Sequence, residues 1–255
     1  MDVYKLKSKK KELENLIAET SKGMTIENKE AIRQCRIYRE NLLIIEGQLE
    51  QCERAIRKLK KDSRIGAKFS RRTFKNWDAD KFPNAYRICL RYAKNFETAS
   101  KGGMGLILTG NAGTGKTHLA SAISNYLMDD LIPVKFGTFA DLLDSLKESF
   151  HTDRTQKIVK ALGEVPLLVI DDLGKEKYTD WSSQVLFQVI DKRYNKELPT
   201  IITTNLSMEE LRRRVGDPIM SRLIETSYGV VMKGENYRYA HGKEIYHSGA
   251  SGAES

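Results

Sequence analysis

Apolar residues recur at alternating intervals of three and four over residues 26–62, and this spacing predicts a long amphipathic helix. A shorter helix is predicted over residues 3–21, with leucines and an isoleucine on one face. Gly23 suits the end of the first helix and Thr25 the start of the second. We therefore expect a helical hairpin, whose seam could serve self-packing, dimerisation or docking on a helical partner. The seam residues are Cys35, Tyr38, Leu42, Ile45, Leu49, Cys52, Ile56 and Leu59.

Residues 63–100 are expected to form a connector, interrupted by Gly66 and Pro83, with one helix over about 84–95. From residue 105 onward, short apolar strands alternate with amphipathic helices. The predicted strands are GLILTG, PVKFGT, PLLVIDD, TIITTN and GVVMK. Nearly continuous apolar strands separated by helices are typical of a parallel sheet covered on both faces. We expect an α/β core with a parallel five-stranded sheet.

The net charge of +9 is unevenly distributed along the chain. Residues 66–100 hold eight Lys and Arg against three Asp and Glu, and residues 1–65 are also basic, whereas the remainder is nearly balanced. Such a region can meet nucleic acid or an acidic protein surface, or can simply be a solvated helical face.

The three cysteines fit no zinc spacing and cannot all pair, and the four histidines lack metal-ligand spacing. No apolar run approaches the roughly 20 residues of a membrane span, and no signal peptide is evident. We expect a reduced, cytoplasmic protein with no membrane partner.

A glycine-rich loop follows the first predicted strand and opens a helix, which is the context that a phosphate-binding loop requires. Its glycines let backbone N–H groups face the phosphates, Lys116 would bridge the β- and γ-phosphates, and Thr117 would bind Mg²⁺. No guanine-reading motif is present, so ATP is the expected nucleotide. The candidate nucleotide-binding residues are Gly110, Asn111, Ala112, Gly113, Thr114, Gly115, Lys116, Thr117 and His118.

Polar residues that end later strands complete the expected site. Asp171 would hold Mg²⁺, and Asp172 would orient the attacking water. If the fourth strand lies between the first and third, Asn205 would sit near the γ-phosphate as a sensor of hydrolysis. Arg222 is expected on a short helix after the fourth strand, where it could not easily reach its own nucleotide, so it would act in trans on a neighbouring subunit. Arg238 is a second candidate for contacting the γ-phosphate.

Together, GNAGTGKT, LLVIDDLG, TTN, MSRL and NYRYAHGKEIY resemble the motifs of an AAA+ ATPase. More closely, residues 70–247 resemble the DnaC/DnaI helicase-loader family and its IstB-type transposition relatives. The resemblance implies a reduced AAA+ core without a full C-terminal lid, since only 22 residues follow Lys233. Asp172 stands where most AAA+ motors have Glu, which favours slow hydrolysis stimulated by assembly or DNA.

The resulting division of the chain is a basic helical partner-binding domain over residues 1–65, a linker over 66–100, an ATPase domain over 101–247 and a disordered tail over 248–255. The resemblance implies an ATP-dependent loader that binds a DnaB-type hexameric helicase through its N-terminal domain, places it on single-stranded DNA and forms a homo-oligomer. Two alternatives stay open: an IstB-type transposition ATPase on duplex DNA, and an adaptor that binds ATP but hardly hydrolyses it. Basic and aromatic residues expected near DNA are Lys147, Phe150, Lys175, Lys177, Tyr178 and Trp181.

Overall fold

The computed structural model describes residues 3–22, 28–147, 152–176 and 178–234. The chain forms two compact units. The first comprises residues 1–61 with residues 128–131, and the second comprises residues 62–127 and 132–255. The expectations for a short C-terminal lid and a disordered tail concern residues outside the described ranges.

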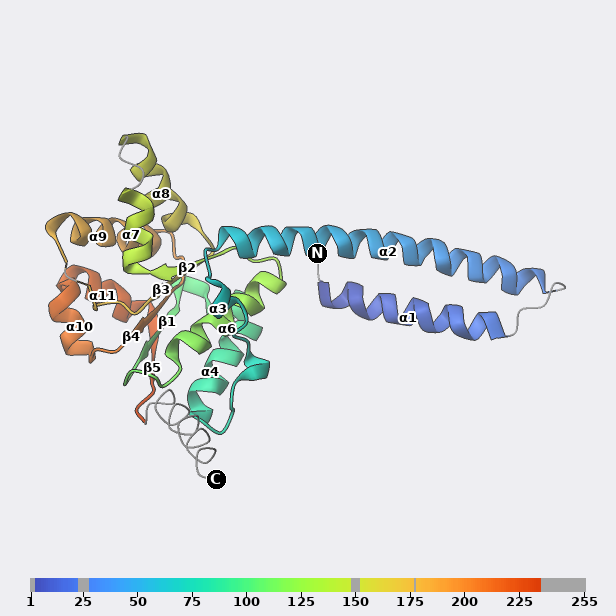
Figure 1. The fold of residues 1–255 in the computed structure, drawn as a ribbon, viewed down its shortest axis with the longest axis horizontal. Helices are drawn as coiled ribbons and strands as arrows, with labels where there is room; N and C mark the ends of the chain where they lie inside the picture. Colours follow the sequence, from blue (N-terminus) through green and yellow to red (C-terminus); the bar gives the residue numbers. More distant parts are fainter. Residues whose placement is uncertain (1–2, 23–27, 148–151, 177, 235–255) are drawn as a thin grey trace, which may run out of the picture. The chain divides into compact units, whose positions relative to one another are not determined.

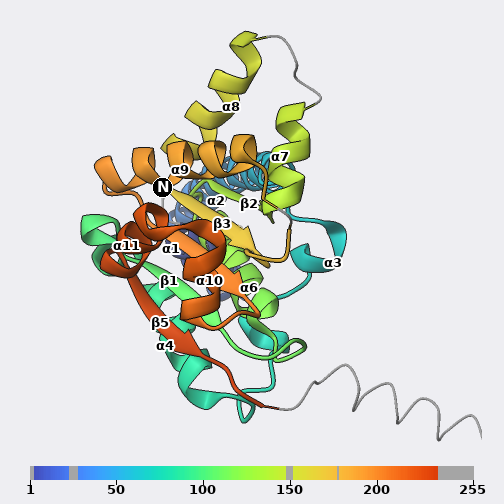
Figure 2. The same cartoon turned by 90° about the vertical axis from the view of Figure 1, so that its left-hand side faces the viewer.

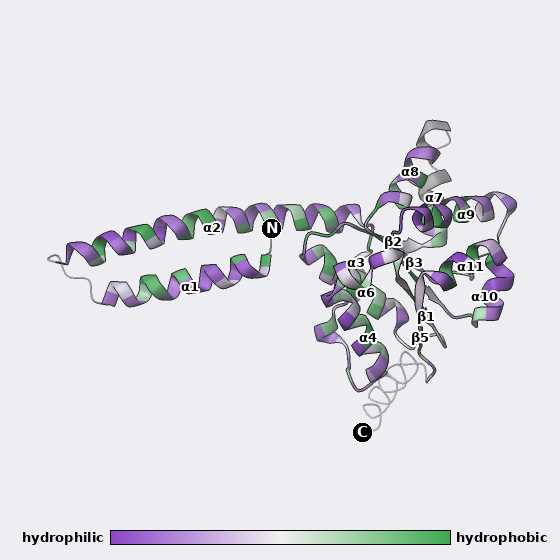
Figure 3. Ribbon diagram, turned by 180° about the vertical axis from the view of Figure 1, so that it is seen from behind, coloured by the Kyte–Doolittle hydropathy of each residue, from purple (hydrophilic) through white to green (hydrophobic). Residues whose placement is uncertain are grey.

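The first unit contains the predicted helical hairpin, formed by α1 (Val3–Lys22) and α2 (Lys29–Asp62), which lie side by side (Figure 1). The predicted seam is the interface of this hairpin, because Ile45 and Leu49 of α2 are buried with Leu13 of α1. Lys10 on α1 also donates a hydrogen bond to Glu46 on α2 at 2.8 Å. Figure 3 shows hydrophobic residues recurring among hydrophilic ones along both helices, as expected where a seam takes one apolar residue every three or four positions.

The second unit is built on an all-parallel sheet with the strand order β2-β3-β4-β1-β5. This result confirms the predicted five-stranded α/β core, with β4 between β1 and β3. Because the strands are parallel, all five carboxyl ends meet at one edge. The strands are β1 (Gly105–Thr109), β2 (Val134–Thr138), β3 (Leu167–Asp171), β4 (Thr200–Thr204) and β5 (Ser227–Val231).

Helices cover both faces of this sheet (Figures 1 and 2). On one face lie α4 (Pro83–Lys94) and α6 (Lys116–Asp129), and on the other lie α9 (Asp180–Asn195), α10 (Met208–Val215) and α11 (Asp217–Glu225). The remaining helices are α3 (Ala67–Ser70), α5 (Phe96–Ala99), α7 (Phe139–Lys147), α8 (Thr152–Glu164) and two 3₁₀ turns, Phe74–Asn76 and Lys101–Gly103.

Side chains that alternate along the strands divide the core between the two faces. Ile107, Ile170 and Ile202 pack against the helices that follow β2, β3 and β4, in one cluster that includes Leu186 and Leu223. α8 was not predicted from the sequence, although its Leu162 joins this cluster.

A buried arginine joins α8, α9 and β4. Arg193 is 1% exposed and donates hydrogen bonds to the carbonyl oxygens of Leu162, Val165 and Pro199 and to the Thr200 hydroxyl. Burial lowers the pKa of Arg193 to about 9. The guanidinium therefore satisfies carbonyls from segments that are distant in sequence, as buried polar groups require.

The three cysteines are buried and free. Among the described helices, none combines the length and the apolar character needed to cross a bilayer.

Candidate nucleotide-binding site

The glycine-rich loop connects the carboxyl end of β1 to the start of α6, so it lies at the sheet edge where the other strands also end. Two of its glycines occupy conformations and spaces that other residues could not. Gly115 has φ 97°, and a Cβ there would lie 2.4 Å from the Trp77 ring. Gly110 has φ 143°, and a Cβ there would lie 2.0 Å from the Met232 carbonyl oxygen. The loop is thus enclosed by residues 77 and 232 from outside the motif.

The Lys116 ammonium lies inside this loop. It donates hydrogen bonds to the carbonyl oxygens of Gly110 and Asn111, both at 2.7 Å, and to Asn205 Oδ1 at 2.8 Å. The side chain is thereby held over the loop, with only 6% of the residue exposed. The structure brings the predicted lysine and the predicted sensor asparagine into direct contact.

Asp171 at the end of β3 receives hydroxyl hydrogen bonds from two other elements. Thr117 Oγ1 donates to Asp171 Oδ1 at 2.8 Å, and Thr203 Oγ1 donates to the same oxygen at 2.5 Å. Burial raises the pKa of the Asp171 carboxyl, while the hydrogen bonds from Thr203 and Thr117 act in the opposite direction. Sequence reasoning missed Thr203, whose only signal was its place two residues before Asn205, near the end of a strand.

The second acid, Asp172, is oriented by three contacts. Its N–H donates to Thr203 Oγ1 at 2.9 Å, its Oδ1 accepts from Asn205 Nδ2 at 2.6 Å, and its Oδ2 pairs with Lys175 at 3.2 Å. Asp172 also has φ 58°, in the left-handed region that Asp tolerates better than most residues. The backbone conformation supplies a physical reason for Asp rather than Glu at this position.

These contacts form one connected network at the sheet edge. Asn205 bridges the ammonium of Lys116 and the carboxylate of Asp172, while Thr203 bridges Asp171 and Asp172. A nucleotide phosphate that attracts Lys116 would therefore change the contact of Asn205 with Asp172, the acid expected to orient water.

Three further loop residues belong to the predicted nucleotide-binding set. Thr114 Oγ1 donates to the Asn111 carbonyl oxygen, Ala112 is exposed and Gly113 has φ 81°.

A segment before the core lies against the loop helix, and sequence reasoning did not predict it. His118 Nδ1 lies 2.9 Å from Arg72 Nη1, its Nε2 lies 3.0 Å from the Thr73 carbonyl oxygen, and the Trp77 ring packs edge-on against it. Asn125 on α6 donates to the carbonyl oxygens of Phe69 and Arg72. We call residues 69–77 the strap. Burial lowers the pKa of His118, the Thr73 carbonyl opposes this shift and the Arg72 guanidinium adds to it.

Arg222 lies on α11, and its side chain contacts α9 and its own helix. It pairs with Asp191 at 2.7 Å, donates to the Pro218 carbonyl oxygen at 2.8 Å, and lies over the rings of Phe187 and Tyr194. The structure does not bring Arg222 together with Lys116 and Asp172. The expected role of Arg222 at a neighbouring nucleotide stays a prediction.

The chain beyond β5 returns to the loop, since Asn111 Nδ2 donates to the carbonyl oxygen of Gly234 at 3.3 Å. Arg238 lies outside the described residues. Of the residues expected near DNA, Tyr178 is partly buried and its ring stacks on Phe139. Trp181 is 39% exposed. Phe150 and Lys177 lie outside the described ranges.

The donors at this edge suit Mg²⁺, which prefers oxygen ligands. The Thr117 hydroxyl and the Asp171 carboxylate are 2.8 Å apart, and the carboxylate is buried at 5% exposure with a raised pKa. A cation beside Asp171 would relieve the cost of burying its charge. Within the described residues, no group of three or more His, Cys, Asp or Glu side chains could hold a metal ion by itself. Further ligands would therefore come from phosphate oxygens and water.

Comparisons with known proteins agree with this site. The model of the IstB-like ATP binding protein family matches residues 8–244. The replicative helicase loader DnaC of Escherichia coli strain K12 is 33% identical over 135 residues, which are 52% of this chain and 55% of that protein. The DnaC of Buchnera aphidicola subsp. Baizongia pistaciae is 31% identical over 159 residues, covering 60% of this chain and 63% of the relative. This chain thus spans little more than half the length of such curated relatives.

Solved structures show the same core. A crystal structure of the DnaC helicase loader superimposes with a TM-score of 0.59 at 28% identity, over 66% of this chain and all of that chain. A structure of DnaI gives a TM-score of 0.57 at 26% identity, over 68% and 94% of the two chains. DnaA bound to AMPPCP and single-stranded DNA shares the fold, with a TM-score of 0.57 at 21% identity over 72% and 56%. With a family match across most of its length, this chain belongs to the IstB-like ATP-binding proteins and has the AAA+ fold of the DnaC and DnaI helicase loaders.

Proposed function

We propose that this protein is an ATP-dependent loader that binds a DnaB-type hexameric replicative helicase and delivers it onto single-stranded DNA at the initiation of replication. The network that joins Lys116, Asn205, Asp172 and Asp171 carries the proposal, because it links the nucleotide-contacting lysine to both acids. The similarity to DnaC proteins supports a loader rather than another AAA+ protein.

In this mechanism, ATP binding draws the Lys116 ammonium from the loop carbonyls to the β- and γ-phosphates. Thr117 and Asp171 would hold Mg²⁺, which would supply positive charge beside the phosphates. Asn205 then holds Asp172 where its carboxylate can accept a hydrogen bond from the attacking water. Arg222 from an adjacent subunit stabilises charge at the γ-phosphate, and Arg238 contacts the same phosphate within the subunit. Hydrolysis is slow, since the Asp172 carboxylate is engaged by Lys175 and is one methylene shorter than Glu.

The hairpin supplies the surface for the helicase. Leu43 and Ile44 on α2 are 69% and 59% exposed, and they lie outside the seam that packs on α1. Adjacent exposed apolar side chains on a helix suit docking against another helix.

A capture experiment with the replicative helicase of the host tests the proposal. We expect the full chain to retain the helicase, and the double variant Leu43→Asp/Ile44→Asp to lose retention while its circular dichroism stays unchanged. Ile88→Asp on α4, which is 41% exposed, is the matched control and should retain binding. Failure of the wild-type chain to bind helicase in any nucleotide state would reject the loader function.

An IstB-type transposition ATPase is the second candidate, since the matching family model is that of IstB-like ATP binding proteins. It predicts ATP-dependent assembly on duplex DNA and capture of a transposase. Stronger ATP-dependent binding to duplex than to single-stranded oligonucleotides would favour this function over helicase loading. An adaptor that binds ATP without hydrolysing it would show no turnover in the presence of either DNA.

A further inference from the structure

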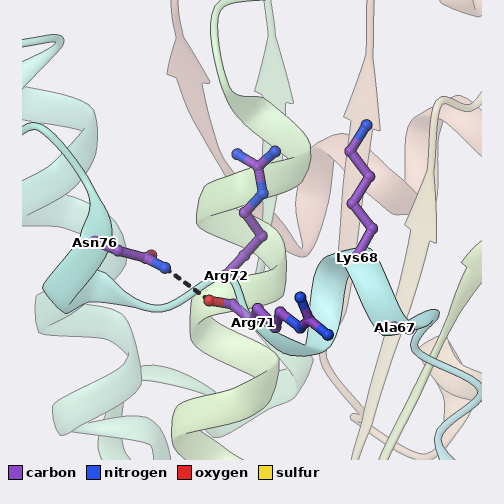
Figure 4. A pocket seen from close by; sticks show the side chains of 5 residues that line it. All are labelled: Ala67, Lys68, Arg71, Arg72 and Asn76. Carbon is purple, nitrogen blue, oxygen red and sulfur yellow. Dashed lines mark hydrogen bonds between the residues drawn. The ribbon is translucent and has the colours of Figure 1, made fainter.

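The structure contains a cationic cavity on the segment before the ATPase core. It has a volume of about 430 Å³ and is lined by Ala67, Lys68, Arg71, Arg72 and Asn76. Figure 4 shows Lys68 and Arg72 extending in the same direction, with Arg71 between them. We call these five residues the basic pocket.

Carboxylates of the described residues do not neutralise the charges in the basic pocket. Among the ion pairs formed within this part of the chain, none joins Lys68, Arg71 or Arg72 to Asp or Glu. Arg72 contacts the ring of His118 instead. Three cations around one cavity repel each other, and an anion bound between them would reduce this repulsion.

The backbone that carries these cations is held in place by several contacts. Asn125 donates to the carbonyl oxygens of Phe69 and Arg72 at 3.1 and 2.8 Å, and Asn76 Nδ2 donates to the Arg71 carbonyl oxygen at 2.7 Å. The Thr73 N–H donates to Asn76 Oδ1 at 2.9 Å. The positions from which the cations extend are therefore fixed before a ligand arrives, which lowers the entropic cost of binding.

We propose that the basic pocket binds the phosphodiester backbone of single-stranded DNA. Guanidinium groups match phosphate oxygens with paired N–H donors, and an ammonium group adds a further contact. The pocket lining contains no aromatic ring on which a base could stack, and its one amide, Asn76, is already engaged by the backbone. The contact would thus position the strand without reading its sequence. This inference rests on the proposed loader function and adds the place where the strand docks.

The basic pocket adjoins the nucleotide site through Arg72. Its guanidinium contacts His118, which follows Thr117 on the first turn of α6. A phosphate group that binds the Arg72 guanidinium would therefore change the contact between the strap and His118, beside the phosphate loop. For this reason, the test replaces the exposed residues Lys68 and Arg71 and leaves Arg72 intact.

The test measures the affinity of the full chain for a labelled 20-nucleotide oligo(dT) by fluorescence anisotropy, over a series of salt concentrations. We expect Lys68→Ala/Arg71→Ala to weaken binding by about tenfold or more and to lower the salt slope by roughly 0.7 for each phosphate that the variant no longer neutralises. The control Lys94→Ala/Lys101→Ala removes the same charge from other exposed positions of this unit and should stay within about twofold of wild type.

Several outcomes would overturn the inference. These are equal reductions of affinity in the two double variants, no binding of oligo(dT) by wild type, or equally strong pocket-dependent binding of a duplex. A decrease in affinity for a fluorescent ATP analogue, with oligo(dT) affinity unchanged, would assign the basic pocket to the nucleotide. Helicase capture by the pocket variant separates the two proposals: if capture persists and DNA binding is unchanged, only the inference fails.

Discussion

Asn205 connects the two halves of the candidate site, because its amide contacts Lys116 through Oδ1 and Asp172 through Nδ2. One side chain thus connects the phosphate loop to Asp172, the acid that we propose orients the attacking water. At the same scale, Arg193 donates to the buried carbonyl oxygens of Leu162, Val165 and Pro199 and to the Thr200 hydroxyl. We propose a role in hydrolysis for Asn205 and a role in stability for Arg193.

Replacing Lys116 with alanine should remove ATP binding without unfolding the protein. Removal of a charge-assisted hydrogen bond to phosphate corresponds to roughly a hundredfold in affinity. Titration with a fluorescent ATP analogue measures the affinity, and a circular dichroism melt measures stability. Lys101→Ala is the control. A collapse of the melt in Lys116→Ala would show that the lysine holds the loop together instead.

Replacing Arg193 with methionine should destabilise the second unit by about 3 kcal/mol or more, because buried carbonyls lose their donors. This corresponds to a decrease in melting temperature of roughly 6–12 °C, measured by differential scanning calorimetry. Lys196→Met removes an exposed pair with Glu164 and should cost about 1 kcal/mol or less. Similar melting temperatures for the two variants would contradict the role of Arg193.

At the scale of elements, the strap packs against α6 and is held there by hydrogen bonds from Asn125. Asn125, buried at 2% exposure, fixes the strap backbone, and the strap places Trp77 against Gly115. The phosphate loop is therefore held from outside by a segment that precedes β1, as well as by its own glycines.

Asn125→Ala should loosen the strap, shift Trp77 emission to the red and weaken ATP binding several-fold. The fluorescence is measured in a Trp181→Phe background, because the chain has two tryptophans. Asn84→Ala, which removes an exposed amide from α4, is the control. An emission maximum that does not move would show that Asn125 does not hold the strap.

Elements with a strong local pattern were predicted well from the sequence, namely the hairpin seam, the five strands and the phosphate loop. α8 was missed because its sequence, TDRTQKIVKALGE, is polar except near its end, and its burial depends on α9. The contacts of Trp77 and Arg72 with the loop helix were also missed. They join residues more than 35 positions apart, and no periodic pattern reports such contacts. Arg193 was unpredictable because a charged residue in the last turn of a helix is usually exposed.

At the scale of the whole molecule, the proposed role of Arg222 in trans would make hydrolysis depend on assembly. Arg222 lies over the rings of Phe187 and Tyr194 on α9 and pairs with Asp191, with 29% of its side chain exposed. To act on a neighbouring nucleotide, the guanidinium would exchange Asp191 for a phosphate of the adjacent subunit. Such an exchange would make the ATPase rate depend on protein concentration.

Two variants separate the catalytic role of Arg222 from its packing role. Arg222→Ala should lower assembled ATPase activity by about a thousandfold, as expected for a residue acting in trans. Asp191→Ala breaks the same ion pair but keeps the cation, so its ATPase activity should equal or exceed that of wild type. Phosphate release is followed across a range of protein concentrations. Equal rates for wild type and Arg222→Ala would remove the trans mechanism.

The hydroxyl of Thr203 has one proton, which it gives to Asp171, so its lone pairs are left to receive the Asp172 amide. Valine has nearly the same size but neither function. Thr203→Val would therefore remove one hydrogen bond from each of two neighbouring acids with a single isosteric change. Metal affinity and turnover should decrease together in this variant, whereas a site with independent acids would lose only one of them.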